Sequence, residues 1–218
     1  MESLFSACTS EESRITTFEK NTAVYCYSEV SAVPTYIIQN CICCTLSIPK
    51  QFRIHECFQK LLDSITFDHC FAQSQRSTAF FGVTTYSYSG IKHRPAAISS
   101  NVVLTELCNV VNKLLPNFKF NSVLLNYYPN SHSKIPCHAD DEADILHDSF
   151  ILTLSLGDTR NMSFFNYSNT KLAKVELHPW DILIFSKISQ FKYKHAVGAG
   201  LELFRSPRLS LTFRNLDF

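Results

Sequence analysis

The second half of the chain alternates between short apolar runs and turn residues. From residue 121 onward these runs recur about every ten residues, and several alternate between apolar and polar side chains. They predict strands at residues 121–128, 135–140, 149–157, 162–167, 181–186, 191–197 and 208–214. Short strands in this number, separated by turns, are typical of a sandwich or a jelly-roll barrel.

Two helical patterns precede these strands. Apolar residues at helical spacing predict an amphipathic helix over residues 52–65, with Pro49 as its start signal. A second pattern predicts a helix over residues 101–115, which Pro116 would end. Between the helices, residues 78–89 are rich in β-branched and aromatic side chains and predict extended structure. The expected fold is mainly β with flanking helices, an α+β arrangement.

Composition narrows the class of protein. A chain of 218 residues with 45% hydrophobic content can bury one sizeable core. Its net charge of +1 excludes holding a phosphate backbone by bulk electrostatics, although local basic patches remain an option. No apolar run approaches the roughly 20 residues that a membrane span needs, and the start lacks the layout of a signal peptide. We expect an intracellular, cytoplasmic monomer with no membrane partner.

The cysteines favour reduced thiols. Nine is an odd number, and without a secretory signal a disulfide framework is not expected. The spacing Cys41-x-x-Cys44 offers zinc as an alternative, since further Cys and His residues follow, but no second C-x-x-C pair exists. These later residues are His55, Cys57, His69 and Cys70.

A candidate metal site begins with His138-Ala139-Asp140. An imidazole and a carboxylate two residues apart on a strand share one face, so they can converge on one ion. His195, in KYKHAV, would complete a facial triad of two histidines and one carboxylate, which leaves iron positions open for a cosubstrate and O₂. Alone, the motif is weak, because a surface His near a surface Asp gives the same letters.

The last predicted strand supports the metal site. Its residues alternate strictly, so one face is apolar and the other is polar. Two arginines facing the inside of a barrel would be costly to bury unless they met an anion. A dicarboxylate is the natural ligand, because a guanidinium pairs with a carboxylate through two hydrogen bonds. The alternative is an edge strand with a solvated polar face. The polar face carries Arg208, Ser210, Thr212 and Arg214.

The order of these motifs resembles the AlkB family of oxidative nucleic-acid demethylases. Asn126-x-Tyr128 is followed by His138-x-Asp140, the lone His195 and the two arginines, and the match covers about residues 78–216. FFGVTTYSYSG is similar to the family's lid segment, and HADDE, ILTLSLG and KHAV look most like the AlkB domains of plant RNA-virus replicase polyproteins. The remaining segments that carry the match are FNSVLLNYYPNSHSKIPCHADDE, ILTLSLGDTRNMSFF, YKHAV and RLSLTFRNL.

The resemblance implies a double-stranded β-helix (jelly-roll) core that uses Fe(II), 2-oxoglutarate and O₂. The matching iron ligands are His138, Asp140 and His195. Arg208 matches the arginine at the distal carboxylate of 2-oxoglutarate, and Arg214 matches the catalytic arginine near its chelating end. The other positions that match cosubstrate contacts are Asn126, Tyr128 and Ser210, where the family often has Asn at the last.

The resemblance also implies a substrate. Asp141 matches an acidic residue that approaches the damaged base, and Tyr86 and Tyr88 match lid aromatics that clamp it, although packing alone would also explain the two rings. The implied reaction removes the methyl group of 1-methyladenine or 3-methylcytosine in RNA or DNA and releases formaldehyde, succinate and CO₂. The target would be single-stranded or flipped out of its stack. RNA is favoured, and viral RNA repair in the host cytoplasm is the expected context.

Three segments are expected along the chain. Residues 1–75 form an N-terminal helical or extended region of unclear role, residues 76–118 the nucleotide-recognition lid with a buttressing helix, and residues 119–218 the dioxygenase core.

Two other functions remain open at the level of sequence. One is a 2-oxoglutarate-dependent hydroxylase of a protein or small molecule, and the other is a non-catalytic nucleic-acid-binding relic of the fold. Basic residues around the third ligand are candidate phosphate contacts, with a solvated face as the alternative. They are Lys187, Lys192, Lys194 and Arg205.

Overall fold

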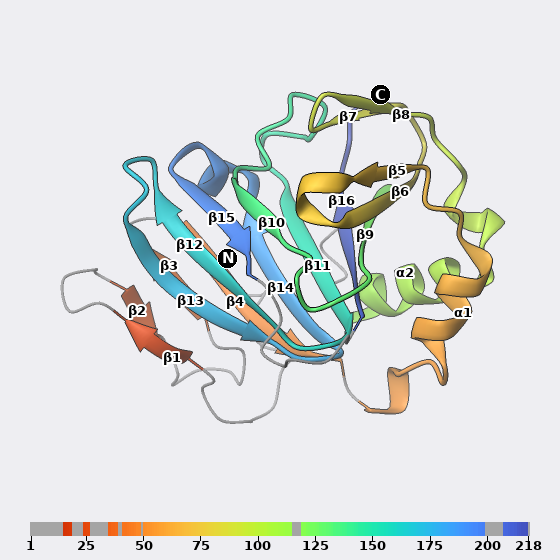
Figure 1. Cartoon of the computed structure of the whole chain (residues 1–218), viewed down its shortest axis with the longest axis horizontal. Helices are drawn as coiled ribbons and strands as arrows, with labels where there is room; N and C mark the ends of the chain where they lie inside the picture. Colours follow the sequence, from red (N-terminus) through yellow and green to blue (C-terminus); the bar gives the residue numbers. More distant parts are fainter. Residues whose placement is uncertain are drawn as a thin grey trace.

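A computed structural model describes most of the chain and shows two antiparallel sheets facing each other as the walls of a jelly roll (Figure 1). The described residues are 15–18, 24–26, 35–38, 41–48, 50–114, 119–198 and 207–217. No helix in these ranges is long and apolar enough to cross a membrane.

The smaller sheet has five strands, and a two-stranded ribbon forms a sheet of its own that packs on the larger sheet through Tyr86 and Phe80. In spatial order the five are β1 (Ile15–Phe18), β13 (Lys171–Leu177), β12 (Arg160–Asn166), β15 (Tyr193–Val197) and β10 (Ile135–His138). The ribbon pairs β7 (Tyr86–Tyr88) with β8 (Ile91–His93).

The larger sheet has nine strands. In spatial order they are β2 (Val24–Cys26), β3 (Thr35–Ile38), β4 (Cys41–Ser47), β14 (Asp181–Ser186), β11 (Phe150–Gly157), β16 (Arg208–Arg214), β9 (Ser122–Tyr128), β6 (Arg76–Gly82) and β5 (His69–Phe71). Strands from all three expected segments therefore share one sheet, and the segment boundaries at 75 and 118 stay predictions.

Two helices cover the larger sheet on the side away from the smaller one (Figure 1). Helix α2 (Val102–Leu114) agrees with the sequence, and the Asn101 side chain caps it by accepting a hydrogen bond from the Leu104 N–H at 3.1 Å. Helix α1 (Cys57–Ser64) starts later than the pattern predicts, because Glu56 has a left-handed φ of 56°. Short 3₁₀ turns occupy Lys50–Phe52 (η2), Ala72–Ser74 (η3), Ile98–Ser100 (η4) and Lys187–Phe191 (η5).

Strand β16 separates two environments, as its alternation predicts. Leu209, Leu211 and Phe213 pack in the cluster that joins the sheet to the helices. The polar side chains of the same strand line a cavity between the two sheets. Because alternate side chains of β16 point to opposite faces of the sheet, its register directs the polar side chains into the cavity inside the jelly roll.

Most predicted strands of the second half are confirmed, and two details differ. The pattern missed β13, whose sequence KLAKVEL carries two lysines and a glutamate on a strand that pairs with β12. The strand expected at 135–140 ends at His138, so Asp140 lies in the loop that follows.

Candidate metal and cosubstrate site

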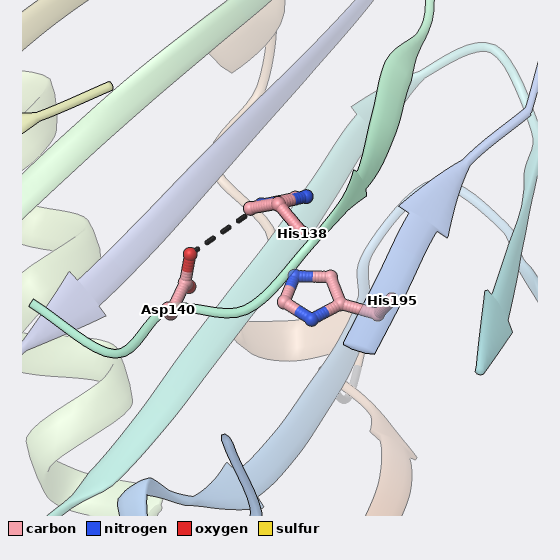
Figure 2. Close-up of side chains that lie close together, drawn as sticks. All are labelled: His138, Asp140 and His195. Atoms are coloured by element: carbon pink, nitrogen blue, oxygen red, sulfur yellow. Dashed lines mark ion pairs between the residues drawn. The ribbon is translucent and has the colours of Figure 1, made fainter. Parts of the chain in front are cut away.

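Three side chains converge between the sheets. His138 ends β10, His195 lies in β15 directly opposite it, and Asp140 comes from the loop after β10. One ligand atom from each side chain lies within 4.8 Å of the other two. Among the described residues, this is the group of His, Cys, Asp or Glu side chains that could hold a metal ion. Figure 2 shows the three side chains close together, with a dashed line between His138 and Asp140. His138 Nε2 lies 3.5 Å from Asp140 Oδ1. The prediction that His138 and Asp140 share one face of a strand is wrong, because Asp140 lies in the loop after β10 and reaches the histidines from there.

The tautomer of His138 suits a metal ligand. Its Nδ1 lies 2.9 Å from the Pro136 carbonyl oxygen, which can only accept, so Nδ1 donates and Nε2 points to Asp140 and the site. Burial would lower the pKa of His138, but the neighbouring Asp140 raises it above its usual value. His195 is fully enclosed, and burial, with the nearby His138, lowers its pKa to about 3. A neutral imidazole is the form that binds metal.

Asp140 is ionised and firmly held. Burial alone would raise its pKa, but the neighbouring Arg214 guanidinium and His138 hold that pKa well below its usual value. Arg214 Nη2 donates to Oδ2 at 2.9 Å. The buried Oδ1 meets no hydrogen-bond donor within the described residues, which suits an atom reserved for a cation.

Residues of turn η5 fix the backbone of Asp140. The Asp140 N–H donates to Gln190 Oε1 at 3.1 Å, and its carbonyl accepts from Lys187 Nζ at 3.0 Å. Lys187 also donates to the Glu142 carbonyl at 2.8 Å. Because Lys187 is buried and these bonds occupy it, its predicted phosphate contact is wrong. Lys192 and Lys194 lie at the surface, and Arg205 falls outside the described residues.

Arg208 is a buried cation that has no carboxylate partner among the described residues. Its Nη2 donates to Ser155 Oγ at 2.9 Å, and its guanidinium lies 5.1 Å from the centroid of the Tyr128 ring. Nε and Nη1 meet no acceptor with hydrogen-bond geometry among the described residues, and burial lowers the pKa of the guanidinium. An uncompensated buried charge of this kind is costly, so the site suits an anionic ligand.

Arg214 lies at the other end of the cavity, near the metal ligands. Its Nε and Nη1 also lack acceptors in the described part, and its guanidinium carbon lies 5.2 Å from the Tyr86 ring. The cavity thus has one guanidinium at each end of its polar wall, which fits a dicarboxylate such as 2-oxoglutarate. Its lining is Tyr88, Asn126, Tyr128, Ile135, His138, Asp140, Thr153, Met162, His195, Val197, Arg208, Ser210, Thr212 and Arg214.

Of the three residues expected to contact the base, which are Tyr86, Tyr88 and Asp141, only Tyr88 lines the cavity. Tyr86 and Tyr88 are buried and stacked at 6.2 Å, and only Tyr88 reaches the cavity wall. Asp141 is exposed and does not line the cavity. Their roles toward a substrate stay predictions.

Sequence reasoning did not single out Gln190, and it also missed two further residues beside the cavity. Arg76 is buried, donates to Asn126 Oδ1 through Nη1 and lies over the Phe71 ring at 4.2 Å. Glu142 has a buried Oε2 without a donor among the described residues, and burial followed by Asp140 raises its pKa. The alternation of Arg76 with Thr78 and Phe80 could have placed Arg76 on the inner face of β6.

The zinc alternative gains no support from the residues that can be described. Cys57 and Cys108 are buried free thiols, and Cys70 and Cys137 are exposed free thiols. The side chains of Cys41 and Cys44 fall outside the described part.

Comparison with known proteins defines the class. The family model of the 2OG-Fe(II) oxygenase superfamily matches residues 54–214. The alkB homolog 3 dioxygenases are similar over much of the chain, at 28% identity to the Bos taurus protein over 86% of this chain and 30% to the Homo sapiens protein over 66%. The chain spans 70% and 52% of those two proteins, respectively.

Two further likenesses are more limited. A DNA oxidative demethylase, ALKBH2 of Arabidopsis thaliana, is 36% identical over 34% of this chain and 22% of its own length. The solved structure of OsALKBH1 has a TM-score of 0.51 at 20% identity, covering 79% of this chain and 97% of that one, and it supports the fold alone.

The chain belongs to the 2OG-Fe(II) oxygenase superfamily, and within it to the AlkB family. It is therefore a dioxygenase that uses Fe(II), 2-oxoglutarate and O₂.

Proposed function

We propose that this dioxygenase removes methyl groups from 1-methyladenine or 3-methylcytosine in nucleic acid, with RNA favoured. The observation that carries the proposal is the cavity itself, which holds the His-Asp-His triad and has at each end of its polar wall a buried guanidinium whose N–H groups lack some acceptors among the described residues. The name of one similar protein, a DNA oxidative demethylase, supports a nucleic-acid substrate.

Iron(II) would be held by His138, Asp140 and His195, the described residues whose donor atoms converge. The buried Asp140 Oδ1 and the His138 Nε2 lone pair fit such an ion. With 2-oxoglutarate and O₂ the iron supplies the oxidising power that hydroxylates an N-methyl group. The hydroxylated group then leaves the base as formaldehyde.

The cosubstrate would lie along the polar face of β16. Arg208 would pair with its distal carboxylate and gain the partner that its Nε and Nη1 lack. Arg214 would contact the end near the metal while its bond to Asp140 keeps that ligand ionised and oriented. Asn126, Tyr128 and Ser210, all in the cavity wall, would complete the polar contacts.

The base would enter beside Tyr88 and the loop of Asp141. Tyr88 offers a ring in the cavity wall, with Tyr86 stacked behind it. Glu142, half-buried with an oxygen that has no donor among the described residues, would be a further acceptor for the exocyclic group of a base. A single-stranded or flipped nucleotide is required, since a stacked base cannot reach a buried metal.

The wider context is also a proposal. The likeness of HADDE, ILTLSLG and KHAV to the AlkB domains of plant RNA-virus replicase polyproteins supports a role in viral RNA repair. For such a role we propose a monomer that acts in the host cytoplasm. Demethylation of matched single-stranded RNA and DNA oligonucleotides, followed by mass spectrometry of the bases, tests the substrate. Faster loss of methyl from RNA is expected, and a strong preference for DNA would contradict the RNA assignment.

A further inference from the structure

An exposed aromatic cluster lies next to the metal site and takes no part in the proposed chemistry. Tyr167 and Phe191 are 52% and 51% exposed, and they are the two aromatic members of the large apolar residues exposed in the described ranges. Leu146, another member of that set, directly precedes His147, whose ring stacks on Phe191 at 5.8 Å with an interplanar angle of 26°. We call Tyr167, Phe191 and His147 the aromatic platform.

The platform is held in place by its neighbours. Tyr167 Oη donates to the Gln190 carbonyl oxygen at 2.8 Å, so its ring is fixed to turn η5. Lys194 Nζ lies 5.5 Å from the centroid of the same ring, and Lys187 Nζ lies 5.6 Å from that of Phe191. Rings anchored at one edge with about half of their surface open are suited to receive a flat partner.

A single residue, Gln190, connects the platform to the metal ligand Asp140 through hydrogen bonds. Gln190, which accepts from Tyr167 through its backbone, accepts from the Asp140 N–H through its side chain. In the sheet, Phe164 lies opposite His195. Tyr167 begins the turn after β12, three residues beyond Phe164, so it lies within about 10 Å of Phe164. A nucleotide next to the one at the metal would therefore reach the platform.

The charges nearby fit a nucleic-acid strand better than an apolar partner. Lys192 is exposed, and Lys194 lies beside Tyr167. Of the exposed acids, Asp148 is paired with His147 at 2.9 Å. Burial, followed by the nearby Asp141, raises the pKa of the Tyr167 phenol. Because Asp141 is exposed and lies near that ring, phosphate groups are expected on the side of the two lysines and away from Asp141.

We propose that Tyr167, Phe191 and His147 stack on unpaired bases that flank the target nucleotide of single-stranded RNA, with Lys192 and Lys194 near the phosphates. Stacking on aromatic rings tolerates any base, so the platform would give affinity without sequence preference. The identity of the target nucleotide rests on the proposed function, whereas the binding of unmodified RNA does not.

Fluorescence anisotropy with an unmethylated single-stranded RNA oligonucleotide tests the platform directly. Tyr167→Leu and Phe191→Leu should each weaken binding about tenfold, because they keep apolar bulk and remove the ring. Tyr167→Phe is the matched control, since it keeps the ring and removes the bond to Gln190. It should bind RNA like the wild type. Unchanged affinity in both Leu variants, or equal loss in Tyr167→Phe and Tyr167→Leu, would overturn the proposal.

A second measurement separates this proposal from the demethylase function. On a methylated mononucleotide, which has no flanking base, the Leu variants should keep wild-type turnover, while on a methylated oligonucleotide their KM should rise about tenfold. Equal losses on both substrates would contradict a flanking-base role. If no methylated substrate reacts, the demethylase proposal fails, and ring-dependent RNA binding would still support the platform.

Discussion

At the scale of single residues, the two buried arginines of the site differ in their hydrogen-bond partners. Within the part of the chain that the structure describes, Arg208 has no carboxylate beside it, whereas Arg214 binds Asp140. The first arrangement is costly in the protein alone and becomes favourable only with an anion. Binding of the cosubstrate and stability should therefore respond in opposite directions to the loss of Arg208.

Arg208→Met tests this directly. The KM for 2-oxoglutarate should rise about 30-fold or more, because truncating one partner of a buried charge pair costs about 2–5 kcal/mol. The melting temperature without cosubstrate should stay the same or rise, since an unpaired buried charge is removed. Steady-state kinetics and thermal unfolding give the two values, with exposed Lys192→Met as control. A KM within twofold of the wild type would contradict the assignment of Arg208.

Cysteine reactivity should follow burial. Burial, with Glu106 nearby, raises the pKa of the Cys57 thiol to about 12, so at pH 8 almost none of it is thiolate. Iodoacetamide should modify the exposed Cys70 and Cys137 at least about tenfold faster than Cys57. Peptide mass mapping over time measures each rate. Labelling of Cys57 as fast as Cys70 would show that this part of the core opens.

At the scale of elements, the turn after β11 supports the arginine site. Gly157 has a φ of +80°, and a Cβ there would lie 2.5 Å from the Pro207 carbonyl oxygen, next to Arg208. The adjacent Asp158 N–H donates to the same carbonyl at 2.9 Å. The turn and the start of β16 are thus packed without room for a side chain.

Gly157→Ala should therefore destabilise the fold by about 2–4 kcal/mol, through both backbone strain and collision. Gly90→Ala is the control, because Gly90 has a similar φ of +77° but open space around its Cβ position. It should cost about 1 kcal/mol. Urea unfolding of both variants measures the difference. Equal costs would show that the contact with Pro207 does not matter.

The β7–β8 ribbon should carry an acid-sensitive group. His93 is buried among Phe80, Tyr88 and His69, and burial, followed by His69, lowers its pKa from 6.5 to about 4. The unfolded chain then binds more protons than the folded one between these values. Stability should fall as the pH drops from about 6.5 to about 4, by up to about 3 kcal/mol from this residue.

His93→Phe should flatten this part of the stability curve. Chemical unfolding at several pH values between 7 and 4, compared with the wild type, gives the contribution of His93. If both proteins lose stability in parallel over that range, His93 does not take up its proton on unfolding.

At the scale of the whole molecule, the sequence predicts the parts that depend on strict periodicity. The alternation of β16 correctly separates core residues from cavity residues, and α2 follows its apolar spacing. His138, Asp140 and His195 meet as expected. Strand β13 was missed because its lysines and glutamate obscure the alternation of its buried residues.

The rest depends on contacts that no local pattern contains. Lys187 reads as a surface lysine, yet its amine binds two carbonyls of the loop after β10. Arg76 lies 50 residues from Asn126, which accepts its hydrogen bond. Such residues become visible only when sheet pairing brings β6, β9 and β16 side by side.

The most direct test of the central claim is to measure succinate and formaldehyde in the same reaction. A single-stranded RNA oligonucleotide with 1-methyladenine or 3-methylcytosine is incubated with iron(II), 2-oxoglutarate and ascorbate, for the wild type and for His138→Ala. The wild type should release both products in equal amounts, and the variant neither. Succinate without formaldehyde would contradict the nucleic-acid substrate, and full activity of His138→Ala would contradict the metal site.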